Sequence, residues 1–317
     1  MREHLKDYIE HGTTTNVRGL RILVEYFHAS DLFDPLKKEG IKIVSVFGSA
    51  RTHPKSPEYR IPLEIGKRLY QAGFAVVTGA SRGVMQAANQ GVAEAIAAQL
   101  VREGHAKSIP TAMEGRRYHE LLKRYSIGLK ITLPFEPGNN PYVGAYGTFH
   151  YFMVRKFFFG SLSSGFIACE GGWGTRDELY EILTLVQTGK APLMPIVYVA
   201  KNARHFRQDL QHALKKGYID PEDMELVAIV PTAARAAREI TSFYRRVESI
   251  QYADKGQIRI ALKSPLPRPV RQRLIRMAGL LKRVATRLEI TPQAVVIHGF
   301  NHSSYGHIRR VVNAINS

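Results

Sequence analysis

The sequence predicts an α/β fold: a Rossmann-like parallel sheet with helices on both faces. Short β-branched runs alternate along the chain with helical segments, which is the pattern of βαβ units. Several of these strands are followed directly by small-residue turns rich in glycine, and ligands of parallel sheets bind at such strand ends. The chain has 317 residues, 44% hydrophobic and 23% charged. This length suits one large α/β domain with a smaller appendage.

The first half of the chain begins with an expected N-terminal helical extension at residues 1–40, because apolar positions from Val17 to Phe27 recur at helical spacing. The segments that follow predict alternating strands and helices. In chain order these are a strand at Ile41–Phe47, a helix at Pro62–Ala72, a strand at Phe74–Thr78, an alanine-rich helix at Val84–Ala98 and a strand at Ser126–Leu133. Residues 99–125 are basic and less regular, so we expect a surface insertion there.

The second half continues the alternation. In chain order we expect a loop at Pro134–Gly147, a helix at Thr148–Phe159, a strand at Gly165–Cys169, a helix at Thr175–Thr188 and a strand at Met194–Val199. Residues 41–250 are therefore predicted to form a nucleotide-binding domain. From residue 251 onward, twelve Lys or Arg residues stand against two acidic ones. This predicts a basic C-terminal α/β extension at 251–317, with an amphipathic helix at Arg271–Leu288 and a strand at Ala294–Ile297.

The formal net charge of +18 indicates an anionic partner, either a nucleotide, a nucleic acid or an acidic surface. The alternative is that the excess Lys and Arg only maintain solubility. A single cysteine, Cys169, excludes an internal disulfide and a cysteine-cluster metal site. The sequence has neither an apolar run of the ~20 residues that a membrane helix needs nor an apolar signal core after Met1. These features predict a cytoplasmic protein without a membrane span.

The strongest local motif is Gly171-Gly172-Trp173-Gly174-Thr175, between a predicted strand and a predicted helix. Glycines let a ligand approach the backbone closely, and the N–H groups and dipole of a helix N-terminus favour an anion. The motif therefore predicts a phosphate site, and a plain glycine-rich turn is the alternative. No Walker lysine follows the loop, and no GxGxxG motif follows the first two strands, so a P-loop NTPase and a dinucleotide site are both disfavoured.

Two readings compete for the carboxylate of Glu178. With Thr175 it matches a capping box, in which Thr175 caps the helix and Glu178 bonds back to the N-cap N–H. Alternatively, Glu178 is a catalytic carboxylate, kept ionised by the helix N-terminus and suited to orienting a water or stabilising positive charge. Arg155 and Lys156 follow an aromatic run, and surface cations with stems on apolar residues are the simple interpretation of that pattern.

The histidines near the C-terminus do not match a common zinc-binding spacing, which leads us to expect no metal and no cofactor. They are His298, His302 and His307.

Taken together, the motifs resemble the LONELY GUY family of nucleoside 5′-monophosphate phosphoribohydrolases, long labelled "possible lysine decarboxylases". The family pattern is a helix with Arg-Lys, then a strand, then Pro-Gly-Gly-x-Gly-Thr-x-x-Glu. Here it corresponds to Met153–Lys156 and Glu170–Glu178. The continuation Leu179–Lys190 and further segments look like the longer bacterial members of the family. These further segments are Val46–Arg51, Ser126–Leu129 and Leu133–Glu136.

The resemblance implies hydrolysis of the N-glycosidic bond of an AMP-like nucleotide or a cytokinin ribotide, giving a free base and ribose 5-phosphate. It also implies a homodimer or higher homo-oligomer, with Arg155 and Glu178 as the catalytic pair. The substrate contacts expected from the resemblance are Glu136, Lys156, Gly171, Gly172, Trp173, Gly174, Thr175 and Thr184. Gly48 and Ser49 are added as substrate contacts because they follow the first strand, where a parallel sheet places its binding crevice.

The sequence departs from the family pattern at two places. Glu170 stands where the family has proline, and an ionised carboxylate close to the loop repels a phosphate. The second-strand turn Gly79–Gly83 replaces a frequent Gly-Gly-Gly-Pro-Gly and contains Arg82, a further anion contact. Two alternatives stay open: a non-catalytic nucleotide-binding sensor or carrier, and a nucleic-acid-binding protein that uses the basic tail.

Overall fold

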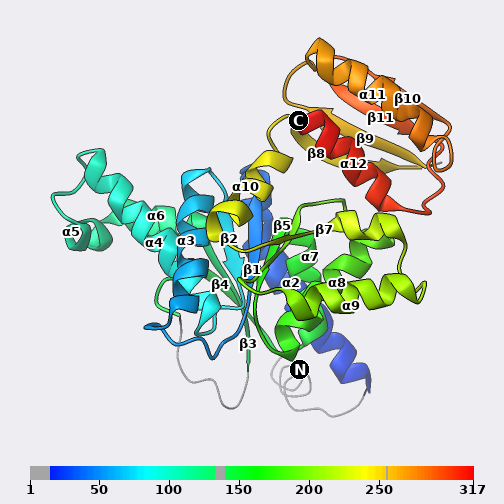
Figure 1. Cartoon of the computed structure of the whole chain (residues 1–317). Coiled ribbons are helices and arrows are strands. Elements are labelled where there is room, and N and C mark those ends of the chain that lie inside the picture. Colours follow the sequence, from blue (N-terminus) through cyan, green and yellow to red (C-terminus); the bar gives the residue numbers. More distant parts are fainter. Residues whose placement is uncertain (1–14, 133–139, 255) are drawn as a thin grey trace. The chain divides into compact units, whose positions relative to one another are not determined.

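The computed structural model describes residues 15–132, 140–254 and 256–317 (Figure 1). The chain divides into two compact units, Met1–Ser164 and Gly165–Ser317, and the division falls within strand β5 (Ser163–Cys169). The larger sheet is seven-stranded with the order β4-β3-β2-β1-β5-β6-β7, and a four-stranded sheet has the order β10-β11-β9-β8. The predicted α/β class with a parallel sheet is confirmed.

The strands of the first unit pair in parallel, β1 with β2, β2 with β3 and β3 with β4. Their bounds are β1 (Ile43–Phe47), β2 (Ala75–Thr78), β3 (Ser126–Ile131) and β4 (Ala145–Phe149). Every residue of β1 and β2 is buried. Continuous apolar runs of this kind are typical of parallel strands that are covered by helices on both faces.

The helices of the first unit pack on these strands and on one another. They are α2 (Thr15–Lys38), α3 (Pro57–Gln71), α4 (Val84–Arg102), α5 (Ile109–Glu114), α6 (Arg116–Tyr125) and α7 (Phe152–Leu162). Helices α3 and α4 approach each other most closely at two glycines. A Cβ atom added to Gly66 would lie 2.0 Å from the Ala88 carbonyl oxygen, and one added to Gly91 would lie 2.0 Å from the Leu63 carbonyl oxygen.

The second unit continues the parallel sheet and then changes to an antiparallel one. Its first elements are β5, α8 (Trp173–Gln187), β6 (Ile196–Val199), α9 (Arg204–Lys215), the 3-10 helix η1 (Pro221–Leu226), β7 (Val227–Val230) and α10 (Ala233–Phe243). The appended elements are β8 (Val247–Ala253), β9 (Gln257–Leu262), α11 (Arg268–Leu281), β10 (Arg287–Ile290), β11 (Ala294–His298) and α12 (Tyr305–Asn316). Neighbouring strands β8 to β11 pair antiparallel.

Helix α12 holds the appended elements against the parallel part of the same unit. Gly306 lies so close to η1 that an added Cβ would meet the Glu222 carbonyl oxygen at 1.9 Å. The buried Arg309 forms an ion pair with Glu239 of α10. Burial lowers the pKa of Arg309, and the Glu239 carboxylate opposes that change. The pairing of this buried cation therefore secures the position of α12.

Several predicted elements need correction. Residues 99–125 are not irregular, because they contain the end of α4 followed by α5 and α6. The predicted loop at Pro134–Gly147, of which residues 134–139 lie outside the described residues, includes the start of β4. The helix expected from Thr148 begins only at Phe152. In the tail, the predicted helix at Arg271–Leu288 is shorter: α11 ends at Leu281, and residues 287–288 belong to β10.

The tight contact between α3 and α4 gives a stability prediction. We expect Gly91→Ala to destabilise the protein by about 1–3 kcal/mol, because a methyl group on backbone packing of this closeness forces the helices apart. The matched control is Gly19→Ala in α2, where nothing lies within 4 Å of the added Cβ. That change is expected to be neutral or to stabilise by up to about 1 kcal/mol. Urea unfolding midpoints compare the two, and equal midpoints would contradict the packing argument.

Candidate functional site

In the first unit, the turns after β1 and β2 are locked together at the carboxyl ends of the strands. A Cβ on Gly48 would lie 2.5 Å from Cγ1 of Val84, the first residue of α4. The Ser49 carbonyl accepts a hydrogen bond from the Val84 backbone N–H at 3.0 Å. Gly83 has a φ of +65° and is in direct backbone contact with Ser49. The predicted residues Gly48 and Ser49 therefore lie at the edge of the sheet where parallel sheets bind ligands.

Arg155 lies beside the second of these turns. A Cβ added to Gly79, directly after β2, would be 3.8 Å from Nη1 of Arg155. The guanidinium carbon stands 4.9 Å from the ring centroid of Phe152 and 5.7 Å from that of Phe159, both on the same helix. Cation–π contacts of this range hold an arginine in a defined direction. Arg155 and its neighbour Lys156 are both half-buried rather than fully exposed surface cations.

The helix that carries Arg155 is positioned by α2. The Glu25 carboxylate of α2 accepts hydrogen bonds from the backbone N–H groups of His150 at 2.7 Å and Tyr151 at 3.2 Å, just before α7 begins. A carboxylate at this place satisfies helix-start donors and complements the helix dipole. The long N-terminal helix therefore fixes where α7 starts, and with it the place of Arg155.

A cavity of about 220 Å³ opens near the same end of β2 and β3. Its lining residues are Ala80, Lys130, Asn140, Pro141, Val143 and Tyr146. Of these residues, the sequence pointed to Ala80 through the turn Gly79–Gly83, whereas the other five were not predicted as site residues. The residue Ala80 has a φ of +55°, an uncommon conformation for a residue with a side chain.

A buried polar network supports that cavity. Fully buried Asn89 of α4 accepts hydrogen bonds from Thr78 at 2.7 Å and from the Asn140 side-chain amide at 3.0 Å, and it donates to Ser126 at 2.8 Å. Asn140 in turn accepts from the Tyr142 backbone N–H at 3.1 Å. Satisfied buried networks hold their members in one arrangement. Asn140 therefore presents a fixed polar edge to the cavity. The predicted contact Glu136 lies outside the described residues.

In the second unit, the glycine loop opens directly into α8. The helix begins at Trp173 with Gly172 as its N-cap, and no side chain caps it. Nothing lies within 4 Å of a Cβ added to Gly172 or Gly174, and Trp173 is 91% exposed. A helix N-terminus with accessible N–H groups and open space around its backbone has the features of an anion site.

The start of α8 corrects one prediction. Thr175 is the third residue of the helix and not its cap, because the helix begins two residues earlier than expected. The predicted capping box of Thr175 and Glu178 is therefore wrong. Both side chains are buried instead, Glu178 with 5% exposure, on the face of α8 that includes Leu179 and Ile182.

Thr184 lies two turns further along α8 and is exposed. Its hydroxyl donates a hydrogen bond to the Tyr180 carbonyl oxygen at 2.8 Å, within the same helix. Of the residues predicted in this unit, Gly171 to Thr175 lie together at the helix start. Glu178 is buried within the next turn, and Thr184 lies away from that end.

Burial and the charge of Glu170 shift the pKa values of two residues next to the glycine loop. Glu170 is exposed and stands where the family has proline. Burial, with a smaller contribution from the Glu170 carboxylate, raises the pKa of the Cys169 thiol to about 12. Burial also raises the pKa of Tyr198 on β6, where Glu170 adds to the increase and the Arg176 guanidinium opposes it. Cys169 is therefore a neutral, buried thiol and not a nucleophile.

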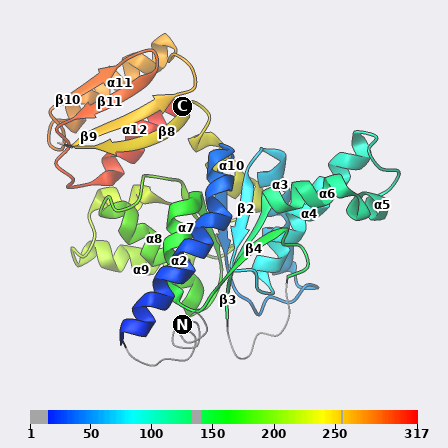
Figure 2. The same cartoon turned by 180° about the vertical axis from the view of Figure 1, so that it is seen from behind.

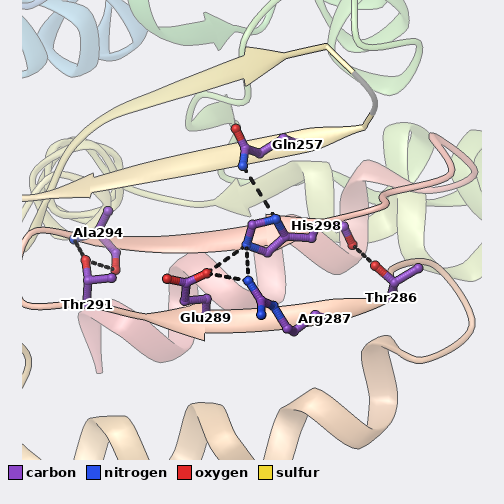
Figure 3. Close-up of polar contacts among 7 residues, drawn as sticks. All are labelled: Gln257, Thr286, Arg287, Glu289, Thr291, Ala294 and His298. Carbon is purple, nitrogen blue, oxygen red and sulfur yellow. Dashed lines mark hydrogen bonds and ion pairs between the residues drawn. The ribbon is translucent and has the colours of Figure 1, made fainter.

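The three C-terminal histidines lie in three different surroundings. His298 contacts Glu289 and Arg287 across β10 and β11, with Gln257 of β9 at its other ring nitrogen (Figure 3). His302 pairs with the Tyr305 hydroxyl at 2.8 Å, and His307 lies 3.7 Å from Glu222. Among the described residues, no group of three or more His, Cys, Asp or Glu side chains is arranged to hold a metal ion.

The parallel sheet with its glycine turns defines a Rossmann-like α/β protein, and comparison with known families makes this more specific. Residues 85–240 match the family described as "Possible lysine decarboxylase", and residues 41–100 match the "SLOG cluster4 family". The match over residues 85–240 agrees with the resemblance of the motifs to the LONELY GUY family. No curated protein matches the sequence significantly.

Solved structures share the architecture at a distance. A molybdenum cofactor binding protein from the phototrophic bacterium Rippkaea orientalis is 19% identical with a TM-score of 0.42, over 64% of this chain and 96% of its own. The molybdenum cofactor carrier protein of Chlamydomonas reinhardtii is 19% identical with a TM-score of 0.40, over 63% of this chain and 96% of its own. At these values neither structure assigns a ligand to this chain.

None of the helices in the described ranges combines the length and the apolar character that crossing a membrane requires.

The raised pKa of Cys169 gives a chemical prediction. At pH 8 only about one thiol in 10⁴ is ionised when its pKa is near 12, and the side chain is buried. We expect iodoacetamide to leave the folded protein unlabelled at pH 8 and to label it once urea unfolds it, because the pKa then returns to its ordinary value. Intact-mass spectrometry measures the label. Rapid labelling of the folded protein would show a reachable thiolate and contradict the assignment.

Proposed function

We propose that this protein hydrolyses the N-glycosidic bond of a nucleoside 5′-monophosphate, releasing a free base and ribose 5-phosphate. The observation that carries the proposal is Glu178. It is a buried carboxylate on the same helix whose glycine-rich N-terminus is open to an anion. The match of residues 85–240 to the possible lysine decarboxylase family supports the same activity.

The glycine loop serves as the 5′-phosphate site in this proposal. The N–H groups at the start of α8 donate to phosphate oxygens, and the helix dipole favours the negative charge. The absence of side chains at Gly172 and Gly174 leaves space for the phosphate to reach the backbone. Binding energy from the phosphate then positions the ribose for reaction.

Glu178 acts on the reacting carbon. Cleavage of an N-glycosidic bond develops oxocarbenium character at C1′, as in other glycoside hydrolyses. An ionised carboxylate stabilises that positive charge and accepts a proton from the attacking water. The water oxygen forms the new bond to C1′, the C1′–N bond breaks, and the departing base takes up a proton. The resemblance to the family assigns Arg155 and Lys156 the role of binding and orienting the anionic substrate.

A non-catalytic nucleotide sensor or carrier is the second candidate, and Glu170 is the observation that favours it. Its exposed carboxylate stands directly before the glycine loop and acts on Cys169 and Tyr198. A negative charge there alters the electrostatics that turnover needs. The activity assay below separates the two candidates.

We further propose that the protein works as a homodimer. Helices α2 and α7 lie side by side in the first unit (Figure 2), with Tyr26 and Phe157 rings 5.4 Å apart. Their outer surfaces expose large apolar side chains: Leu20, Leu23, Val24, Tyr26, Phe27, Phe152, Met153 and Phe157. Such a collection marks a protein interaction site. A second copy of this chain is the natural partner, because α7 also carries Arg155 and Lys156 of the proposed site.

The activity prediction concerns Glu178→Gln. We expect the wild-type protein to release ribose 5-phosphate from at least one nucleoside monophosphate, and the variant to lose about 10³-fold in kcat, since glutamine cannot accept a proton. Nucleotide binding should survive. It can be followed directly, because Trp173 is the single tryptophan of the chain and lies at the loop, so its fluorescence reports ligand there.

A panel of nucleoside monophosphates gives the possible outcomes. If a nucleotide changes the Trp173 fluorescence but none of the nucleotides yields product, the protein is a sensor or carrier and not a hydrolase. If no nucleoside monophosphate changes the fluorescence and none yields product, the proposed nucleotide site itself is wrong. Glu181→Gln, one turn further along α8, is the matched control and should retain activity.

The dimer prediction concerns Met153→Glu combined with Phe157→Glu. Charges on this surface oppose burial, so we expect a dimeric wild-type protein to become monomeric while remaining folded. Sedimentation velocity measures the mass, and circular dichroism checks the fold. Ile109→Glu combined with Tyr218→Glu places the same charges on exposed apolar residues elsewhere and should leave the dimer intact. A monomeric wild-type protein would contradict this interface.

A further inference from the structure

Helix α11, which belongs to the appended antiparallel part, carries several cations and no acidic residue. Residues 255–288 contain ten Lys or Arg and no Asp or Glu. Six of these cations lie on α11 or just after it, and all six side chains are exposed. They are Arg268, Arg271, Arg273, Arg276, Lys282 and Arg283. Within the described parts of the chain, none of the six forms an ion pair with a carboxylate.

The apolar side of α11 is already occupied. Val270, Leu274 and Leu281 are buried, and the helix contacts α12 and β10 (Figure 1). Among the described side chains of α11, the outward side has one large apolar residue, Ile275, at 65% exposure. An interfacial membrane helix needs an outward apolar face, and a protein interface needs an apolar centre with aromatic residues. The described side chains on the outward face of α11 form neither feature.

We propose that the outward face of α11 binds the phosphate backbone of duplex DNA. Interfaces with nucleic acid are more positively charged and more polar than interfaces with proteins, as this face is. Arginine predominates in the set, and its planar guanidinium binds a phosphate through two parallel hydrogen bonds. The positive charge of the outward face of α11 is therefore complementary to the negative charge of the DNA backbone.

The shape of the surface favours a duplex over a single strand. Single strands bind through aromatic side chains on which bases stack, and the outward face of α11 has none among its described residues. A helix of fourteen residues presents a convex rod about 21 Å long. The major groove of B-form DNA, about 12 Å wide, admits such a helix, whereas the deep and narrow major groove of an RNA duplex does not.

This activity is separate from the proposed nucleotide hydrolysis. It uses α11 of the appended sheet, and it involves neither the glycine loop nor Glu178. DNA binding and nucleotide turnover can therefore succeed or fail independently of each other.

The test measures binding of the full chain to a fluorescent DNA duplex of about 20 base pairs, roughly two helical turns, at several salt concentrations. The variant is Arg268→Gln, Arg271→Gln, Arg276→Gln and Arg283→Gln together. Each lost phosphate contact should reduce the slope of log K against log salt by about 0.9, so by about 3 to 4 in total. We expect affinity to fall about 10-fold or more. Circular dichroism confirms that the variant is folded.

The matched control removes four exposed cations from the other unit: Lys55→Gln, Arg60→Gln, Lys107→Gln and Lys123→Gln. It changes the net charge equally and should leave most of the affinity and slope unchanged. Equal loss in both variants would show that net charge alone attracts DNA and would overturn the proposal.

Three further probes test the choice of partner. An RNA duplex of the same length, phosphatidylserine vesicles and polyglutamate should all bind more weakly than the DNA duplex at the same salt concentration. If any of these probes binds the wild-type protein as tightly as duplex DNA does, and the α11 variant no longer binds that probe, the proposal of duplex DNA as the partner is wrong.

Discussion

The close backbone contacts at the carboxyl ends of the parallel strands are the constraint on which the first unit depends. Gly48 leaves room only for Val84, and Gly83 lies against the Ser49 backbone. Two strand ends and the start of α4 are thereby joined into one rigid edge. Because α7 is positioned independently by Glu25 of α2, Arg155 reaches this edge from a fixed direction. The predicted substrate contacts Gly48 and Ser49 are thus held by backbone geometry.

Helix α8 illustrates how a local rule is broken at a proposed functional site. A side-chain cap at Thr175 is what local propensity favours, and it would have satisfied the first N–H groups of the helix. The structure begins the helix earlier, at a glycine without a cap, and buries both Thr175 and Glu178. An uncapped helix start is less stable alone, and it leaves donors available for a ligand.

The sequence was sufficient to predict what depends on short-range patterns. Apolar β-branched runs such as Ile41–Phe47 identify buried parallel strands, and the glycine loop was located to within two residues of the start of α8. It was insufficient for β4, because Ala145–Phe149 contains a glycine and is half-exposed at the edge of the sheet. The cavity beside Asn140 was not predictable, since it depends on Asn89, fifty-one residues away. Such contacts leave no periodic signal.

The distribution of acidic residues separates two kinds of cation in the second unit. Arg309 and Arg310 of α12 pair with Glu239 and Glu225, and these pairs join the appended elements to the parallel part of the unit. Their charges are neutralised by structural contacts. The arginines of α11, in contrast, are exposed and have no acidic neighbour within residues 255–288. Mutual repulsion among them opposes the compact state, so their presence calls for a compensating partner outside the chain. Helix α11 is therefore a more specific basic feature than the net charge of the whole protein.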